Sequence, residues 1–179
     1  MTEEKTNKMR EIEIEKVVLS AGAVGDELEK SAKLLRLISG REAIKTKSKK
    51  RIPDFGIRPG LEIGCKVTLR GKEAEEILKR LLLAIDNKLK EKQINEEDFS
   101  FGIEEYIEIP GTEYQRDIGM IGLNVTIVFK RKGKRVKIRK IKKGKIPKKQ
   151  RVTKQEIIEL MKNKFDTEII EGKLKGGED

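Results

Sequence analysis

Apolar residues recur along this chain with two spacings, which predict strands and helices in a mixed order. Residues 12–19 place Ile12 and Ile14 in alternation and end in an apolar run, so they predict a strand. After a small-residue turn at 20–25, leucine and isoleucine recur at helical spacing. This pattern predicts a helix with Asp26 as its N-cap and Gly40 as its stop.

The clearest predicted strand covers residues 61–70. Apolar side chains occupy alternate positions from Leu61 to Leu69, and polar or small residues fill the positions between them. This alternation is typical of a sheet that has one buried face and one polar face. Before this strand, residues 41–60 are basic and rich in proline and glycine, which predicts an exposed loop.

The second half of the chain predicts further elements of both kinds. A helix is expected over about 72–90, a strand over 99–109 that is irregular near Glu104 and Glu105, and a strand over 123–130. Thr153 and Glu156 have the spacing of a capping box, so they predict a final helix.

Together these elements indicate an α+β fold, in one domain over 1–179 with a basic extension at 130–154 and a frayed tail at 170–179. The two long helices are expected to pack on the apolar face of a largely antiparallel sheet. The other face would then be open to a partner or simply solvated. A face with hydroxyl, amide and basic groups suits RNA; here it carries Lys66, Thr68, Arg70, Asn124 and Thr126.

Charge adds a second feature. The net charge is +11, and residues 130–154 hold 15 Lys or Arg and no Asp or Glu, whereas the rest of the chain has 27 basic and 31 acidic residues. Such a block is expected to bind the phosphates of a polyanion. The alternatives are a solvated loop with no partner, and a membrane-surface segment, which Gly133, Gly144 and Pro147 disfavour because they interrupt any amphipathic helix.

Composition weighs against most enzyme classes. The chain has no His, and its single Cys65 falls on the apolar face of its strand, where an inert core thiol is expected. No cofactor or metal is predicted. No signal peptide or transmembrane run is found, so a cytoplasmic protein is expected. Two alternatives stay open, a free-standing RNA chaperone and a metal-dependent RNA-processing enzyme that uses Glu104 or Glu105.

Several motifs then resemble one family. Residues 54–58 (DFGIR) and 63–71 (IGCKVTLRG) resemble ribosomal protein five of the large subunit, the universal family that binds 5S rRNA. Residues 99–105, 109–111 and 117–122 continue the resemblance in the same order. The stretches 151–154 and 164–168 are similar to the archaeal and eukaryotic branch, and the resemblance runs from about residue 9 to residue 170.

The resemblance implies a structural protein of the large subunit that has several partners. These are 5S rRNA and large-subunit rRNA in the central protuberance, the peptidyl-site tRNA, and a small-subunit head protein across an intersubunit bridge. For 5S rRNA it implies Ser20, Arg41 and Thr68, with Ser20 and Arg41 standing where the family usually has Asn and Gln, and the predicted polar sheet face adds Lys66 and Arg70.

Two further sets of cations complete the candidate site. The resemblance implies that a loop contacts tRNA or rRNA through Lys47, Lys49, Lys50, Arg51 and Arg58. The basic segment is expected to bind rRNA through Lys130, Arg131, Lys134, Arg135, Lys137, Arg139, Lys140, Lys142, Lys143, Lys145, Lys148, Lys149 and Arg151.

Overall fold

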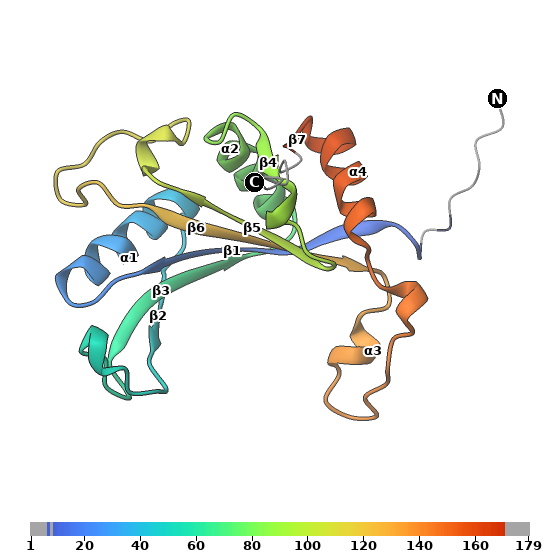
Figure 1. Ribbon diagram of the computed structural model, residues 1–179, viewed down its shortest axis with the longest axis horizontal. Coiled ribbons are helices and arrows are strands. Elements are labelled where there is room, and N and C mark those ends of the chain that lie inside the picture. The colour runs from blue at the N-terminus through green and yellow to red at the C-terminus, as the bar shows by residue number, and fades with distance from the viewer. Residues whose placement is uncertain (1–6, 8, 171–179) are drawn as a thin grey trace, which may run out of the picture.

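A five-stranded antiparallel sheet forms the centre of the molecule, as a computed structural model shows (Figure 1). The structure describes residue 7 and residues 9–170. The strand order is β2-β3-β1-β6-β5, and β4 and β7 form a separate parallel pair. The strands are β1 Ile12–Gly22, β2 Ile44–Lys47, β3 Glu62–Leu69, β4 Lys88–Lys90, β5 Asp98–Ile103, β6 Leu123–Arg131 and β7 Glu168–Ile170; the α-helices are α1 Asp26–Ser39, α2 Lys72–Leu83, α3 Arg135–Ile138 and α4 Lys154–Phe165. The predicted α+β fold is confirmed.

The core lies between the apolar face of the sheet and its helices. Leu19 of β1, Leu69 of β3 and Phe129 of β6 are fully buried, as are the inward residues of α1 and α2. Phe99 and Phe129 stack with ring centroids 5.8 Å apart. Burial of each such side chain contributes roughly 1.5–3 kcal/mol. The hydrophobic effect therefore decides which sheet face the helices cover.

Helix ends follow the local signals only in part. Gly40 ends α1 in the left-handed conformation, as predicted, but the N-cap of α1 is Gly25, and Asp26 is the first helical residue. The predicted turn at 20–25 begins later, because β1 continues to Gly22 and pairs with β3 on one side. At α4 the capping box is confirmed, and the Thr153 amide donates to Glu156 Oε2 at 2.9 Å.

Three predicted elements differ from the structure. The helix expected over 72–90 ends at Leu83, and Asp86 and Asn87 turn the chain with positive φ, so that Leu89 enters β4. The strand expected over 99–109 ends at Ile103, followed by a 3-10 turn, Tyr106–Glu108. The loop expected over 41–60 contains the edge strand β2. The frayed tail was predicted over 170–179, of which only Ile170 lies within the described residues.

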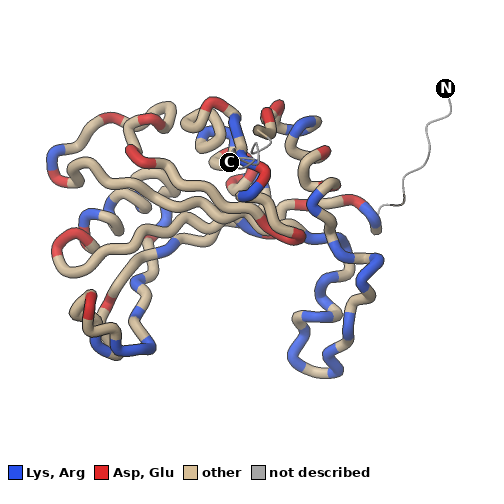
Figure 2. The backbone as a smooth tube through the Cα atoms, in the orientation of Figure 1, with Lys and Arg blue, Asp and Glu red and all other residues tan. Residues whose placement is uncertain are grey.

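Two segments project from the body of the molecule. We call residues 48–61 the proline loop and residues 132–152 the basic arm. In Figure 1 the proline loop extends downward at the left, beyond β2 and β3, and the basic arm extends downward at the right. Figure 2 shows Lys and Arg along both projections, with one acidic residue, Asp54, in the proline loop, whereas most acidic residues lie on the body.

Candidate nucleic-acid interface

The open face of the sheet brings the predicted polar residues into rows. Ser20 of β1 pairs with Lys66 of β3 on one side and with Asn124 of β6 on the other. Side chains opposite each other on neighbouring strands lie about 4.5–5.5 Å apart at Cβ. Lys66 and Asn124 are exposed, and Ser20 is half-buried. One row across three strands thus presents an ammonium, a hydroxyl and an amide to solvent.

A second row lies one step along the strands. Val18 pairs with Thr68 and Thr126, and Thr126 in turn pairs with Ser100 of β5. Ser100 is exposed, and the two threonines are half-buried. Hydroxyl groups that donate and accept are well suited to the 2′-hydroxyls and phosphates of RNA. The prediction that this face stays open is confirmed by these exposures.

The remaining candidates for the sheet site stand at its margins. Arg70 is exposed just after β3. Arg41 follows α1, and its guanidinium pairs with Glu73 of α2 at 2.5 Å, with 51% and 58% of the two side chains exposed. Exposed pairs of this kind contribute only about 0–1 kcal/mol. Arg41 can therefore exchange Glu73 for a phosphate at small cost.

The proline loop is a closed hairpin. The Ser48 amide donates to the Leu61 carbonyl at 2.8 Å, and Ile52 and Ile57 exchange two backbone hydrogen bonds of 3.0 Å each. Its basic residues are all exposed, and in the described part of the chain none of them has an acidic partner. They are Lys47 at the end of β2 and Lys49, Lys50, Arg51 and Arg58 in the loop.

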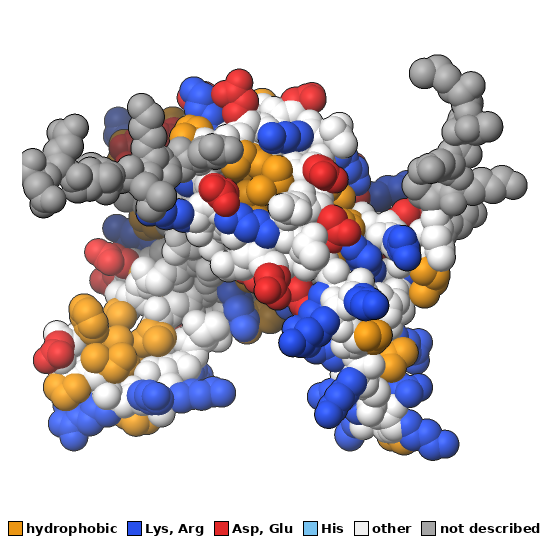
Figure 3. Space-filling view, turned by 45° about the vertical axis from the view of Figure 1, so that its right-hand side comes forward, with side chains coloured by type: hydrophobic (Ala, Val, Ile, Leu, Met, Phe, Trp, Pro, Cys, Tyr) orange, Lys and Arg blue, Asp and Glu red, His pale blue; other side chains and the backbone are white. Residues whose placement is uncertain are grey.

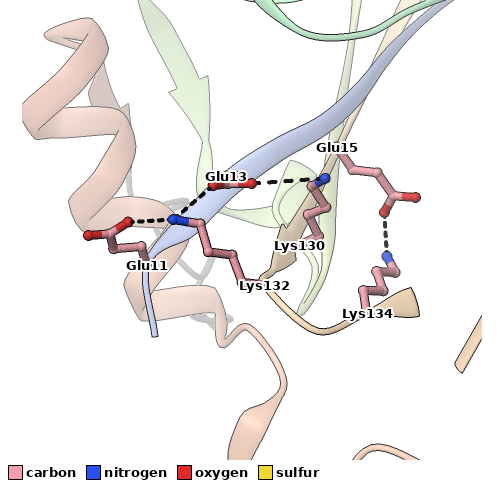
Figure 4. Close-up of polar contacts among 6 residues, drawn as sticks. All are labelled: Glu11, Glu13, Glu15, Lys130, Lys132 and Lys134. Carbon is pink, nitrogen blue, oxygen red and sulfur yellow. Dashed lines mark hydrogen bonds and ion pairs between the residues drawn. The ribbon is translucent and has the colours of Figure 1, made fainter. Parts of the chain in front are cut away.

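The base of the basic arm is held to the body by a ladder of ion pairs. Glutamates at alternate positions 11, 13 and 15 face lysines at alternate positions 130, 132 and 134 (Figure 4). Two of the pairs follow from the sheet register, because Glu13 lies directly opposite Lys130, and Glu11 and Lys132 are the next positions on that side of the strands. Lys134 lies past the end of β6 and reaches back to Glu15. Lys134 Nζ donates to Glu15 Oε2 at 2.5 Å. The hydrogen bond from Lys132 to Glu11, together with the charge of Glu11, raises the pKa of Lys132.

These contacts change the list of free cations. Lys130, Arg131 and Lys134 are all predicted to contact rRNA. In the structure Lys130 and Lys134 form ion pairs with β1, and Arg131 pairs with Glu156 of α4, so an rRNA contact would have to compete with these pairs. Lys154, at the far end of the segment, pairs with Glu91 at 2.6 Å. The cause is local neutralisation, since the acidic residues of β1 and α4 lie beside the base of the arm.

Beyond that base the arm keeps its charge. Its ten remaining cations are exposed, and none has an ion-pair partner among the described residues. They are Arg135, Lys137, Arg139, Lys140, Lys142, Lys143, Lys145, Lys148, Lys149 and Arg151. The Gly144 amide donates to the Val136 carbonyl at 3.0 Å and draws the two sides of the arm together. A self-repelling array of this kind is suited to a polyanion.

A cavity of about 410 Å³ lies where the arm meets the body. Lysines and arginines from both sides of the arm line it, together with one carboxylate, that of Glu97. The buried Arg131 Nε beside it has no hydrogen-bond partner in the structure. The charge of its lining therefore makes this cavity suitable for an anion as well.

The residues considered for other chemistry lie apart from this surface. Cys65 is buried, and that burial raises the pKa of its thiol. Glu104 and Glu105 are exposed after β5. Within residues 9–170 no group of three His, Cys, Asp or Glu side chains is placed to hold a metal ion. Nor is any helix in that range long and apolar enough to cross a membrane.

Two features of the surface were missed from the sequence. The glutamate ladder was missed, although its signal is visible as Glu at 11, 13 and 15 and Lys at 130, 132 and 134. The loop that contains Phe55 was predicted to be exposed, but Phe55 itself was not named as a candidate site residue. The glutamate ladder needs knowledge of which strands pair.

Comparison with known proteins gives one consistent result along the chain. Residues 7–58 match the family described as "Ribosomal protein L5", and residues 62–160 match the C-terminal part of the same ribosomal family. The large ribosomal subunit protein uL5 of Nanoarchaeum equitans is 44% identical over 165 residues, which cover 90% of this chain and 98% of that protein. The protein of the same name from Sulfurisphaera tokodaii is 42% identical over 170 residues, covering 93% of this chain and 96% of the relative.

Proposed function

The chain belongs to the ribosomal protein L5 family and is a protein of the large ribosomal subunit, and we propose that its open sheet face binds 5S rRNA. Membership in this family of ribosomal proteins confirms the prediction that the chain is not an enzyme. The observation that carries the proposal is the accessible row of Lys66, Ser20 and Asn124 across three strands.

The chemistry of the row supports recognition of RNA shape and backbone. Lys66 supplies a charge for a phosphate, while Ser20 and Thr68 supply hydroxyls that both donate and accept. Arg70 follows β3 and Arg41 follows α1, at the margins of the sheet, and their guanidinium groups suit bidentate phosphate contacts. A sheet holds these groups at fixed spacing, so the site is matched to one arrangement of backbone rather than to charge alone.

The two projections extend this function to other RNA. The ten unpaired cations of the basic arm would bind large-subunit rRNA through its phosphates. From the family resemblance, the cations of the proline loop would contact the peptidyl-site tRNA, and their exposure without an acidic partner among the described residues supports this assignment. The contact with a small-subunit head protein rests on the family resemblance, and no residue is assigned to it.

Equilibrium binding at one fixed salt concentration tests the 5S proposal. The protein should bind 5S rRNA more tightly than random RNA of the same length. Lys66→Gln should weaken this binding about tenfold, the loss expected for one charge-assisted hydrogen bond of roughly 1.5 kcal/mol. Thr68→Val should weaken it by a smaller factor, because it removes a neutral hydroxyl and keeps the side-chain shape.

The matched control is Lys79→Gln. Lys79 is exposed on α2, away from the open face, and its replacement removes the same charge. The proposal fails if the two glutamine variants lose affinity equally. It also fails if 5S rRNA and random RNA bind alike.

A further inference from the structure

Phe55 is an exception among the phenylalanines of this chain. The chain has five, and four of them, Phe99, Phe101, Phe129 and Phe165, are between 0% and 7% exposed. Phe55 is 76% exposed. A single exposed apolar side chain is ordinary, but a contiguous exposed apolar patch marks an interaction site. Figure 3 shows hydrophobic side chains gathered on the proline loop, at the lower left, with Lys and Arg along its lower rim.

The outward position of Phe55 is built into the backbone. Pro53 begins the 3-10 turn that contains Phe55, and Gly56 ends it with φ of 63°, a conformation that favours glycine. The Gly56 amide donates to the Pro53 carbonyl at 2.9 Å. The paired Ile52 and Ile57 close the turn at its base. A ring held in this way loses little conformational entropy when it meets a partner.

The charge around the ring selects the kind of partner. Residues 47–60 contain five basic side chains and one acidic side chain, that of Asp54. An aromatic ring among unpaired cations is the arrangement that proteins use for unpaired nucleotides, in which bases stack on the ring and phosphates meet the cations. An apolar surface of a partner protein would match the ring but not these charges.

We propose that Phe55 stacks on an unpaired nucleobase of a structured RNA while Lys49, Lys50 and Arg51 bind the adjacent phosphates. The inference rests on the proposed RNA contact of the proline loop and adds to it the group that recognises a base. Charge alone would hold any polyanion, whereas the ring requires a base that is free to stack.

The absence of tryptophan from the chain makes the test specific. In a Phe55→Trp variant of the full chain, the indole at position 55 is the sole tryptophan emitter. An RNA hairpin with an unpaired loop should quench its emission in a saturable way, because a stacked base quenches the indole. Inorganic polyphosphate, which has charge but no base, should bind without quenching.

Two further variants locate the effect. Tyr114→Trp places an indole at another exposed aromatic position, since Tyr114 is 54% exposed, and its emission should not change with the hairpin. Adding Lys49→Gln and Lys50→Gln to the Phe55→Trp variant should shift half-quenching to higher RNA concentration. Circular dichroism confirms that each variant keeps the fold.

The outcomes separate the inference from the function on which it rests. Absent quenching at position 55, with hairpin binding by anisotropy still weakened by the two lysine substitutions, overturns stacking and leaves the loop contact standing. Equal quenching at positions 55 and 114, or quenching by polyphosphate, also overturns stacking. Binding that is insensitive to the lysine substitutions removes the loop contact itself.

Discussion

The division of the basic arm into paired and unpaired lysines predicts how RNA binding depends on salt. Two triple variants remove the same charge from different places. The outer variant changes Lys140, Lys142 and Lys143 to Gln, and these side chains have no acidic partner in the described chain. The inner variant changes the three ladder lysines at 130, 132 and 134, which pair with glutamates of β1.

The magnitude follows from counterion release. Each phosphate neutralised by a cation contributes about 0.9 to the slope of log affinity against log salt on a duplex. The outer variant should therefore lower the slope by up to about 2.7. A rise from about 50 to 200 mM salt should then reduce its affinity for RNA roughly 40-fold less than it reduces that of the parent chain. The inner variant should change the slope by less than about 1, because its lysines already face carboxylates.

Filter binding of a large-subunit rRNA fragment over a salt series measures both slopes. The inner variant leaves the glutamates at 11, 13 and 15 unpaired, and their repulsion of RNA is strongest at low salt, so the two variants are compared by slope and not by affinity at one salt concentration. Equal slope changes in the two variants would refute the distinction between paired and unpaired lysines, since they would mean that the ladder opens and its lysines bind phosphate.

Three other predictions concern stability and reactivity. Gly122→Ala would place a Cβ 2.7 Å from the carbonyl oxygens of residues 103 and 104, so it should lower the free energy of unfolding by about 1–3 kcal/mol in urea, whereas Gly22→Ala, with open space around it, should change it by less than about 0.5 kcal/mol. Burial alone would raise the pKa of Glu156, but hydrogen bonds from Thr153 and the Arg131 guanidinium lower it. The free energy of unfolding should therefore fall as pH drops through that lowered pKa. In urea titrations at acid pH, a Glu156→Gln variant should show a smaller fall than the parent chain. Because burial raises the pKa of Cys65, its thiol should react with a disulfide reagent only in denaturant, and fast reaction of the native protein would contradict its place in the core.

Local signals in the sequence were enough to predict helix ends and the polar face of β3. Gly40 ends α1 and the Thr153–Glu156 capping box opens α4, because a helix end depends on a few neighbouring residues. The alternation in β3 correctly assigned its polar face. Near its start, however, Leu61 is 38% exposed, because the proline loop carries it away from the body.

The elements that were missed depend on distant partners. The three residues of β4 form a strand because β7 lies beside them, about 80 residues later in the chain. The pairs of Lys130 and Lys132 with Glu13 and Glu11 likewise require that β1 pairs with β6 in the observed way. The sequence predicted the same rRNA contact for all 13 cations named above, whereas in the fold the cations nearest the body face acidic residues.

For the candidate site, the sequence predicted which residues share a face but not how they are arranged across the strands. The set of side chains on the open face could be listed from the alternation, but not that Ser20 stands between Lys66 and Asn124, because strand order is a property of the whole fold. Turn composition predicted an exposed loop over residues 41–60, but not that Phe55 is held outward on it, because that depends on how the proline loop is closed.

The central claim is that this protein holds 5S rRNA on the large subunit through the open face of its sheet. Sedimentation of large subunits that carry either the parent chain or the Lys66→Gln, Thr68→Val double variant tests it directly. The account predicts that the parent chain and 5S rRNA leave the subunit together when salt is raised, and that the double variant loses 5S rRNA at lower salt. Retention of 5S rRNA at the same salt in both particles, or its release while the protein stays behind unaffected, would contradict the account.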